Sequence, residues 1–468
     1  MAAPDLGLLP RERGLLQAQA YEARDRLARS LTWRYGALGP GVASYPEIGA
    51  MRATDALLTA RSRRVFNAAN AILVLDGPPP AGLSVPLPSG EYLPAAKAEP
   101  VSRALPAAYR DETGLTLSGV VTRTHEAGFL PVVLERALHD ALRSHSGSAF
   151  GLWSSMADVD NEHAVIAGGA EVVDEMLPTL ARAALEVTGQ LAERGVPREW
   201  VQEAVERRLR VLESPAAEVE TALEAAYAAL SDRVPMTYDE LIAQLRGTDP
   251  EEVDRAAREL HASLLVGLPE AAPLHRSIPA VSFPESRSQG SGSKHSHVNW
   301  PADLTTFSTD QQGAERVTGG GMCRVMRFES VVALLSYRDG ARHLIGRDGN
   351  VLEMEPREWM RGKDLTKALD AAIPPDLHLA MPDRTVTFQP MSVTDRSARA
   401  FARIANTRIG LTSLLAVVSL LALWGIVAGH LIPGVVLLIL AAALGAQLWR
   451  MEMGDTAGAS VTPPPTTT

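Results

Sequence analysis

The feature that most constrains the fold is a long stretch near the end of the chain without a charged side chain, from Leu411 to Trp449. A single helix over this stretch would be roughly 58 Å long, about twice the hydrocarbon thickness of a bilayer. Pro433 and Gly434 interrupt it, and proline is accepted in the first turn of a second helix. A buried helical pair in a soluble core is the alternative, but both segments are apolar on all sides. The sequence therefore predicts two transmembrane helices within residues 410–451.

Arginines around this stretch predict its orientation. They precede the first span or follow the second, and none lies in the turn between them: Arg396, Arg399, Arg403, Arg408 and Arg450. Because basic residues stay on the cytoplasmic side, both the large N-terminal part and the C-terminus are expected to be cytoplasmic. The start of the chain lacks the pattern of a secretory signal. Residues 385–409 form a basic juxtamembrane segment, and residues 452–468 are predicted to be a disordered tail.

Composition excludes some classes of partner and site. The formal charge of -10 on 468 residues is not concentrated in acidic runs, so it favours solubility and argues against a nucleic-acid partner. The single cysteine, Cys323, cannot close an intramolecular disulfide or supply a thiolate-rich zinc site.

A Gly- and Ser-rich stretch at 285–297 predicts a flexible linker between two folded parts. His295 and His297 within it form an HxH pair that could ligate a metal, but no third ligand lies nearby. The simpler interpretation is a spacer, and no metal ligand is assigned.

Before the linker, strand-like and helix-like patterns follow one another. Strands are expected at 114–123, 148–158 and 163–169, and a helix at 201–212. The apolar stripe that runs to Leu191 is interrupted by Pro178, so that helix is either kinked or begins near the proline. These patterns predict an α+β fold, with α/β as the alternative, in which helices pack against a mostly antiparallel sheet.

After the linker, residues 298–384 are predicted to form a small antiparallel β domain. Asp339-Gly340 and Asp348-Gly349 lie between short apolar runs, and Asp-Gly pairs favour tight hairpin turns. A helix follows at about 357–372. The rhythm of strands resembles a pleckstrin-homology-type fold. In such a domain next to a membrane, four arginines would contact anionic lipid headgroups. They are Arg327, Arg338, Arg342 and Arg347. The alternative is that they form an ordinary solvated face.

Motifs that carry chemistry are not found. The sequence has no HExxH, HxxEH, GxSxG or phosphate-loop pattern. The stretch RSHSGSAFGLW at 143–153 contains serines and His145 but no signal for a third catalytic group. THEAG at 124–128 lacks a second histidine. No catalytic residue is therefore assigned.

Several segments together resemble a known family. A strand is followed by a helix ending in LRSHSGSAFGLW, a paired strand, a helix start GVPREWV at 195–201 and the segment RGTDPEEVDRAARELHASLLVG at 246–267. This order is similar to the C-terminal half of the insulinase/pitrilysin family of inverted zinc peptidases. Upstream, residues 54–80 resemble the end of that family's N-terminal half, where a helix leads to an Asn and then a strand. The resemblance implies a partial N-terminal module at 1–95 and a C-terminal module at 96–284.

The resemblance also implies how zinc would be held. Family catalysis needs an HxxEH helix and a distal Glu ligand, and the chain is expected to start too late to contain that helix. In RERGLLQAQAYEARDR, Gln19 stands where the distal ligand would be, and Glu12 or Glu22 is the ligand in the alternative registers. Residues 11–31 are equally explained as a helix with a buried apolar stripe. Zinc is therefore expected only if the protein is part of a zinc endopeptidase.

The family's C-terminal half carries an Arg and a Tyr that hold the substrate backbone. By resemblance, Arg143 matches the Arg, and Phe150 takes the place of the Tyr and lacks its hydroxyl donor. These two are the candidate substrate-binding residues. Arg143 as a solvated residue at a helix end is the alternative.

Together these observations predict a membrane-tethered peptidase-like protein that is not active alone. It would act as a partner subunit or as a peptide-binding scaffold, with another peptidase-family subunit or a second copy as partner. One alternative is a zinc endopeptidase whose HxxEH half lies upstream or on a partner chain. Another is a membrane adaptor in which the peptidase-like module is only structural.

Overall fold

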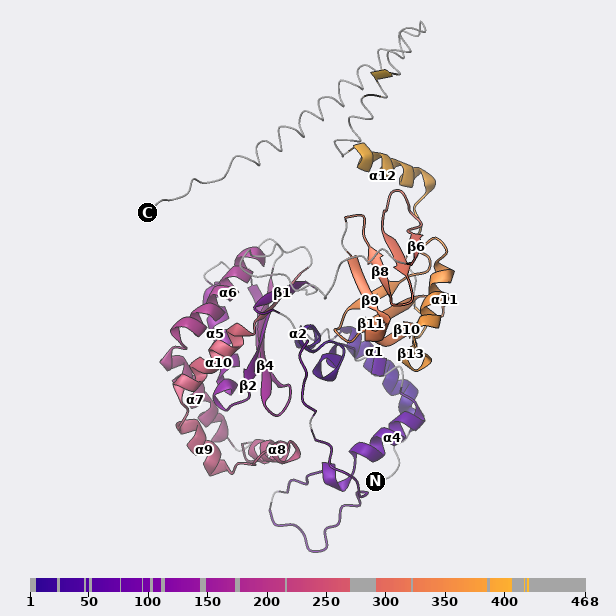
Figure 1. The fold of residues 1–468 in the computed structure, drawn as a ribbon. Helices are drawn as coiled ribbons and strands as arrows, with labels where there is room; N and C mark the ends of the chain where they lie inside the picture. Colours follow the sequence, from indigo (N-terminus) through magenta and orange to yellow (C-terminus); the bar gives the residue numbers. More distant parts are fainter. Residues whose placement is uncertain are drawn as a thin grey trace, which may run out of the picture.

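The computed structural model describes most of the chain that precedes the predicted transmembrane segment. The described residues are 6–22, 26–45, 48–49, 53–75, 77–94, 96–101, 104–110, 114–143, 149–172, 177–214, 217–269, 292–320, 323–384, 388–405, 416 and 419–420. Figure 1 shows a sheet covered by helices, a smaller β domain, and N-terminal helices of which α2 lies between the two.

The first body, here called the sheet-and-helix module, spans 107–268. Its strands are β1 (Ala107–Arg110), β2 (Leu115–Thr122), β3 (Ala149–Asp158), β4 (His163–Val172) and β5 (Leu265–Leu268). Its helices are α5 (Leu130–Arg143), α6 (Leu177–Arg194), α7 (Arg198–Leu212), α8 (Ala217–Leu230), α9 (Tyr238–Arg246) and α10 (Pro250–Ala262). The predicted strands and the helix at 201–212 are found here. Helix α6 is described from Leu177, next to Pro178, and residues 173–176 lie outside the described residues, so the choice between a kinked helix and one that begins near the proline stays a prediction.

The strand order in this module is β1-β5-β2-β4-β3, and only the β1–β5 pair is parallel. On β2, alternate side chains face opposite sides, so Leu115 and Leu117 pack under α5, α6 and α10. Figure 1 shows those three helices on one face of the sheet and α2 on the other. The α+β class with a mostly antiparallel sheet is therefore confirmed.

Helix α2 (Arg26–Tyr35) covers the second face of the sheet. Leu31 and Tyr35 pack with Val165 and Ala167 of β4. Arg34 is buried beside β2, where its guanidinium donates to the Ser118 carbonyl oxygen at 2.5 Å, and burial lowers its pKa to about 10. Both faces of the central strands are thus covered, which explains why β2 is buried at successive positions.

The second body, the β domain, contains two four-stranded sheets. Their orders are β6-β7-β8-β9 and β12-β11-β10-β13. The elements are β6 (Ser293–Ser296), β7 (Thr306–Thr309), β8 (Gly313–Val317), β9 (Cys323–Arg327), β10 (Val331–Ser336), β11 (Arg342–Gly346), β12 (Val351–Met354), α11 (Gly362–Ala372), β13 (His378–Ala380) and the following α12 (Val393–Ala405). Gly340 and Gly349 have positive φ in the β10–β11 and β11–β12 turns, as the two Asp-Gly pairs predict.

The described residues before Ala71 form helices and no strand. They are η1 (Leu6–Leu8), α1 (Leu9–Glu22), α2, η2 (Gly39–Ser44), α4 (Asp55–Val65) and η3 (Ala68–Asn70). The helix at 55–65 and Asn67 follow the pattern expected for 54–80. The expected strand does not form within 71–75, because no described strand lies beside it and its apolar side chains are exposed.

Two other boundaries differ from the sequence prediction. Of residues 11–31, the structure describes 11–22 in α1 and 26–31 in α2, and Leu16 is exposed, so the buried stripe is found in α2 and does not run through α1. Ser293–Ser296 pair with β7 as strand β6, so these residues of the predicted linker 285–297 belong to the β domain. Backbone pairing with β7 overrides the weak propensity of Ser and Lys for strands.

Across the part of the chain described, no helix is both long enough and apolar enough to cross a membrane. The two predicted transmembrane helices, residues 410–451, lie outside the described residues except for 416 and 419–420. They stay a prediction.

Candidate functional site

The two candidate substrate-binding residues lie where α5 ends and β3 begins. Arg143 is the last residue of α5, and Phe150 is the second residue of β3, opposite Glu171 of β4. The structure describes the backbone of both residues but not their side chains. Residues 144–148, which include His145, lie outside the described residues. The peptide clamp that the resemblance implies therefore stays a prediction.

Strand β3 is the edge of its sheet and carries a bulge. Among the described strands it pairs with β4 alone. Its register shifts between Phe150 and Trp153, and Gly151 there has a φ of +51°. Bulges at sheet edges commonly redirect side chains or end a pairing. The backbone groups of the free edge are those that another extended chain pairs with.

Next to this edge, residues of α5, α7 and β3 line an open pocket of about 360 Å³. Its lining residues are Val132, Val133, Glu135, Arg136, His139, Leu152, Trp200, Glu203, Ala204 and Arg207. The residues from α5 recur at helical spacing, and Arg143 follows His139 by one turn on the same face. The pocket is within the size range of small-ligand sites.

Charged groups form the rim of the pocket. Arg136 is ion-paired with Glu203, and its guanidinium carbon lies 4.8 Å from the centre of the Trp200 ring. Ser154 of β3 donates to Glu135 at 2.7 Å, which joins the strand to α5. Arg207 is exposed and makes no ion pair with any described residue. The pocket thus combines an apolar floor with one paired and one unpaired guanidinium.

Sequence reasoning did not find this pocket, although two signals were available. The α5 spacing of Val132, Arg136 and His139 marks a helix face that is partly polar. Trp200 lies in the GVPREWV segment, where a tryptophan two residues into a helix favours contact with a neighbouring helix. Neither signal shows that the two helix faces meet.

The residues considered as metal ligands do not come together among the described residues. Gln19, Glu12 and Glu22 all lie in α1. Within the described ranges, no three His, Cys, Asp or Glu side chains are grouped so that they could hold a metal ion. His295 instead contacts the Met360 carbonyl oxygen at 2.9 Å, and the buried His297 packs edge-on against Trp359.

The four arginines of the β domain do not all face solvent. Arg342 is held by both carboxylate oxygens of Asp370, at 2.5 and 2.8 Å, and its side chain is mostly buried. Arg338 is exposed and pairs with Asp383. The predicted headgroup-binding face therefore loses Arg342, because a bidentate carboxylate already satisfies it.

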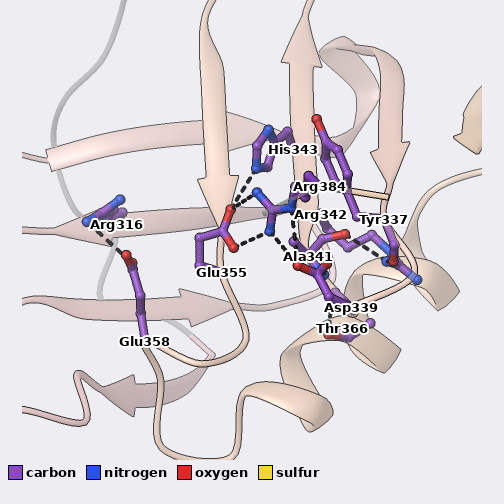
Figure 2. Close-up of polar contacts among 11 residues, drawn as sticks. Arg316, Tyr337, Asp339, Ala341, Arg342, His343, Glu355, Glu358, Thr366 and Arg384 are labelled. Carbon is purple, nitrogen blue, oxygen red and sulfur yellow. Dashed lines mark hydrogen bonds and ion pairs between the residues drawn. The ribbon is translucent and has the colours of Figure 1, made fainter. Parts of the chain in front are cut away.

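A second group of polar residues in the β domain surrounds Arg384 (Figure 2). Arg384 is ion-paired with Glu355 and with Asp339, and it stacks 4.4 Å from the Tyr337 ring centre. His343 contacts Glu355 at 3.0 Å. Burial alone would raise the pKa of Glu355, but hydrogen bonds from His343 and Arg384 and the charge of Arg384 lower it to about 2. The cluster ties β10, β11 and β12 to the chain that leads to α12.

Comparisons with known proteins find similarity at the level of structure. No family model and no curated protein matches the chain. Several of the solved structures that it resembles are described as M16 or insulinase-family peptidases, the family that the sequence resembles. A peptidase M16 inactive domain from Pseudomonas fluorescens has a TM-score of 0.44 and 15% identity over 57% of this chain and 72% of that one.

Two further structures show the range of these similarities. A predicted insulinase family protease from Yersinia pestis has a TM-score of 0.30 and 15% identity, over 41% of this chain and 48% of its own. The inactive peptidase domain of a putative zinc protease from Bordetella parapertussis has a TM-score of 0.27 and 19% identity, over 35% of this chain and 98% of its own. At these scores the similarity assigns no activity to this chain.

Proposed function

We propose that this chain is a peptidase-like scaffold without catalytic activity of its own, which binds an extended peptide along the free edge of β3. In this proposal the peptide backbone pairs with β3, and one of its side chains enters the pocket between α5 and α7. Residues 410–451 tether the protein to a membrane. The fold of residues 107–268 and the family resemblance of its segments support this function over a purely structural module.

The observation that carries the proposal is the position of the pocket beside the outer edge of β3, where no other described strand pairs. Addition of a strand supplies affinity through main-chain hydrogen bonds, and pockets for alternate side chains supply selectivity. Leu152 of β3 lines the pocket, and Ser154, two residues on, is bonded to the lining residue Glu135. A peptide paired with β3 would therefore pass the mouth of the pocket.

The chemistry of the pocket indicates the class of peptide. Its floor is apolar, so it favours an aliphatic or aromatic side chain. Arg207 is unpaired among the described residues, and the exposed Arg136–Glu203 pair is weak enough to open. A carboxylate next to the apolar residue, either an acidic side chain or a peptide C-terminus, would complement these guanidinium groups.

The sequence supports the absence of catalysis and the presence of a tether. The chain contains no HxxEH motif, and Gln19 stands where the family's distal ligand would be. The uncharged stretch from Leu411 to Trp449 supports a membrane hairpin. A zinc-bearing partner subunit of the same family would supply the missing chemistry if the bound peptide is a substrate.

The test is selection of random dodecapeptides against the purified full chain in detergent, followed by affinity measurements on the enriched peptides. Trp200→Ala removes a wall of the pocket and should weaken binding by about tenfold or more, as the loss of an aromatic contact predicts. Tyr227→Ala is the matched control, because Tyr227 is exposed on α8 and does not line the pocket. Equal affinities of the two variants would exclude this pocket as the peptide-binding site.

The same peptides separate the proposal from an enzyme. A scaffold leaves them intact with or without added zinc. Cleavage by the chain alone, abolished by a chelator, would contradict the proposal and favour the zinc endopeptidase.

A further inference from the structure

The end of the β domain nearest α12 exposes large apolar side chains. Trp300 and Leu304, in and after the turn that follows β6, are 51% and 38% exposed, and Val393 at the start of α12 is 70% exposed. Figure 1 shows α12 beyond β6, at the end of the β domain away from α1 and α2. We call Trp300, Leu304, Val393 and the exposed Arg399 the α12 surface.

Specific contacts hold α12 against the turn. The Arg396 guanidinium donates to the Val298 carbonyl oxygen at 2.9 Å, and the Met391 amide donates to the Asn299 side chain at 2.9 Å. Asn299 is buried. These hydrogen bonds hold α12 against the turn. The Trp300 and Val393 side chains are exposed in that arrangement.

Chain length limits how far the α12 surface can lie from the uncharged stretch. Helix α12 ends at Ala405, and the stretch begins at Leu411. Six residues span at most about 20 Å when fully extended. If the stretch crosses a bilayer, the C-terminal end of α12 lies within that distance of the hydrocarbon boundary.

The side chains of this surface match the chemistry of a membrane interface. Tryptophan is enriched at the headgroup level, where its ring is half apolar and half polar. Basic residues close to a membrane are attracted to anionic lipids, and α12 carries Arg396, Arg399 and Arg403.

We propose that the α12 surface rests on the headgroup layer of an anionic bilayer and holds the β domain in a fixed orientation. The occupant of this surface is the membrane into which the chain itself continues. This inference rests on the membrane tether of the proposed function, but not on peptide binding.

The test uses the full chain in nanodiscs of phosphatidylcholine and phosphatidylserine in equal amounts. An environment-sensitive fluorophore is attached in turn through Trp300→Cys, Val393→Cys and Val234→Cys. The native Cys323 is buried, so the unsubstituted protein serves as the labelling control. Val234 is 86% exposed in the loop between α8 and α9 and is the matched control position.

Emission at positions 300 and 393 should shift to the blue and be quenched by nitroxide-labelled lipid, whereas position 234 should be quenched by aqueous iodide. Arg399→Glu should reduce both the shift and the lipid quenching in these discs. A chain that enters the discs but leaves positions 300 and 393 as accessible to iodide as position 234 would overturn the inference. A chain that does not enter the discs would overturn the tether as well, while peptide binding to β3 would be unaffected.

Discussion

Arg136 and Arg384 are both ion-paired arginines, but they differ in how exposed the pair is. Arg136 pairs with Glu203 where both side chains are substantially exposed, and such a pair contributes about 0.2–1 kcal/mol. Arg384 is mostly buried between Glu355 and Asp339. The first guanidinium can therefore exchange its partner for a ligand carboxylate, whereas the second fixes the position of the chain before α12.

At the end of α5, Arg143→Ala should weaken binding of the selected peptides by roughly tenfold, the loss expected for about one charge-assisted hydrogen bond. Arg143→Lys should recover only part of the affinity, because an ammonium keeps the charge but lacks the planar bidentate fork. Fluorescence anisotropy with a labelled peptide measures both. Unchanged affinity in Arg143→Ala would identify Arg143 as a solvated residue at the helix end.

Glu355 predicts a dependence of stability on pH. Its folded pKa of about 2 lies below the unfolded value of about 4.3, so its contribution is present above the unfolded pKa and is lost as pH falls toward 2. Glu355→Gln should lower the free energy of unfolding at pH 7 by roughly 2–3 kcal/mol, and the difference should shrink between pH 4 and pH 2.

Urea unfolding of the full chain at several pH values, followed by hydrogen exchange in β12, measures this effect. Asp383→Asn is the control, since the Arg338–Asp383 pair is exposed and its loss should change stability by less than about 1 kcal/mol. A difference for Glu355→Gln that is constant with pH would contradict the assignment.

Among the elements, α10 shows how a local cap positions a buried face. Asp249 accepts a hydrogen bond from the Glu251 amide at 2.9 Å, and Pro250 occupies the first turn. Val253, Ala256 and Leu260 of this helix pack against the sheet. The cap therefore sets where the buried stripe of α10 begins.

Asp249→Ala should destabilise the sheet-and-helix module by about 1 kcal/mol, because the first-turn amides lose their acceptor. Asp249→Asn should have nearly wild-type stability, since an Asn side chain caps equally well. Thermal unfolding and exchange of the Glu251 amide report the two values. Equal loss in both variants would show that charge, not capping, is the cause.

For the whole molecule, α2 and η2 connect the two bodies. Beyond its packing on β4, this segment contacts the β11–β12 turn, where the Ala37 amide donates to the Arg347 carbonyl oxygen at 3.1 Å. Gly36 makes this approach possible: its φ is +68°, and a Cβ added there would lie 2.0 Å from the Arg347 oxygen.

Gly36→Ala should therefore separate the segment from the β domain. Gly39→Ala is a matched control, because its φ is also positive, at +49°, but a Cβ there meets no atom within 4 Å. Both variants carry the left-handed cost of about 1 kcal/mol, so any additional loss in Gly36→Ala measures the contact. Faster hydrogen exchange at Ala37 in Gly36→Ala alone is expected, and equal exchange in the two variants would contradict the connection.

The sequence by itself determined the features that depend on neighbours along the chain. Apolar periodicity predicted β2, β3, β4 and α7, and the Asp-Gly pairs predicted the two hairpins, because turn chemistry and periodicity are local. The uncharged stretch and the absence of HxxEH are also visible without a structure.

Contacts between distant segments were decided only by the tertiary structure. The pocket requires α5 to meet α7, the strand at 293–296 forms because β7 provides its partner, and 71–75 lacks a strand because no described strand lies beside it. Asp370 is 28 residues from Arg342 in the chain, so only the tertiary structure shows that the Arg342 guanidinium is already paired with it. Burial and pairing depend on which surfaces meet in space, and spacing along one sequence does not specify that.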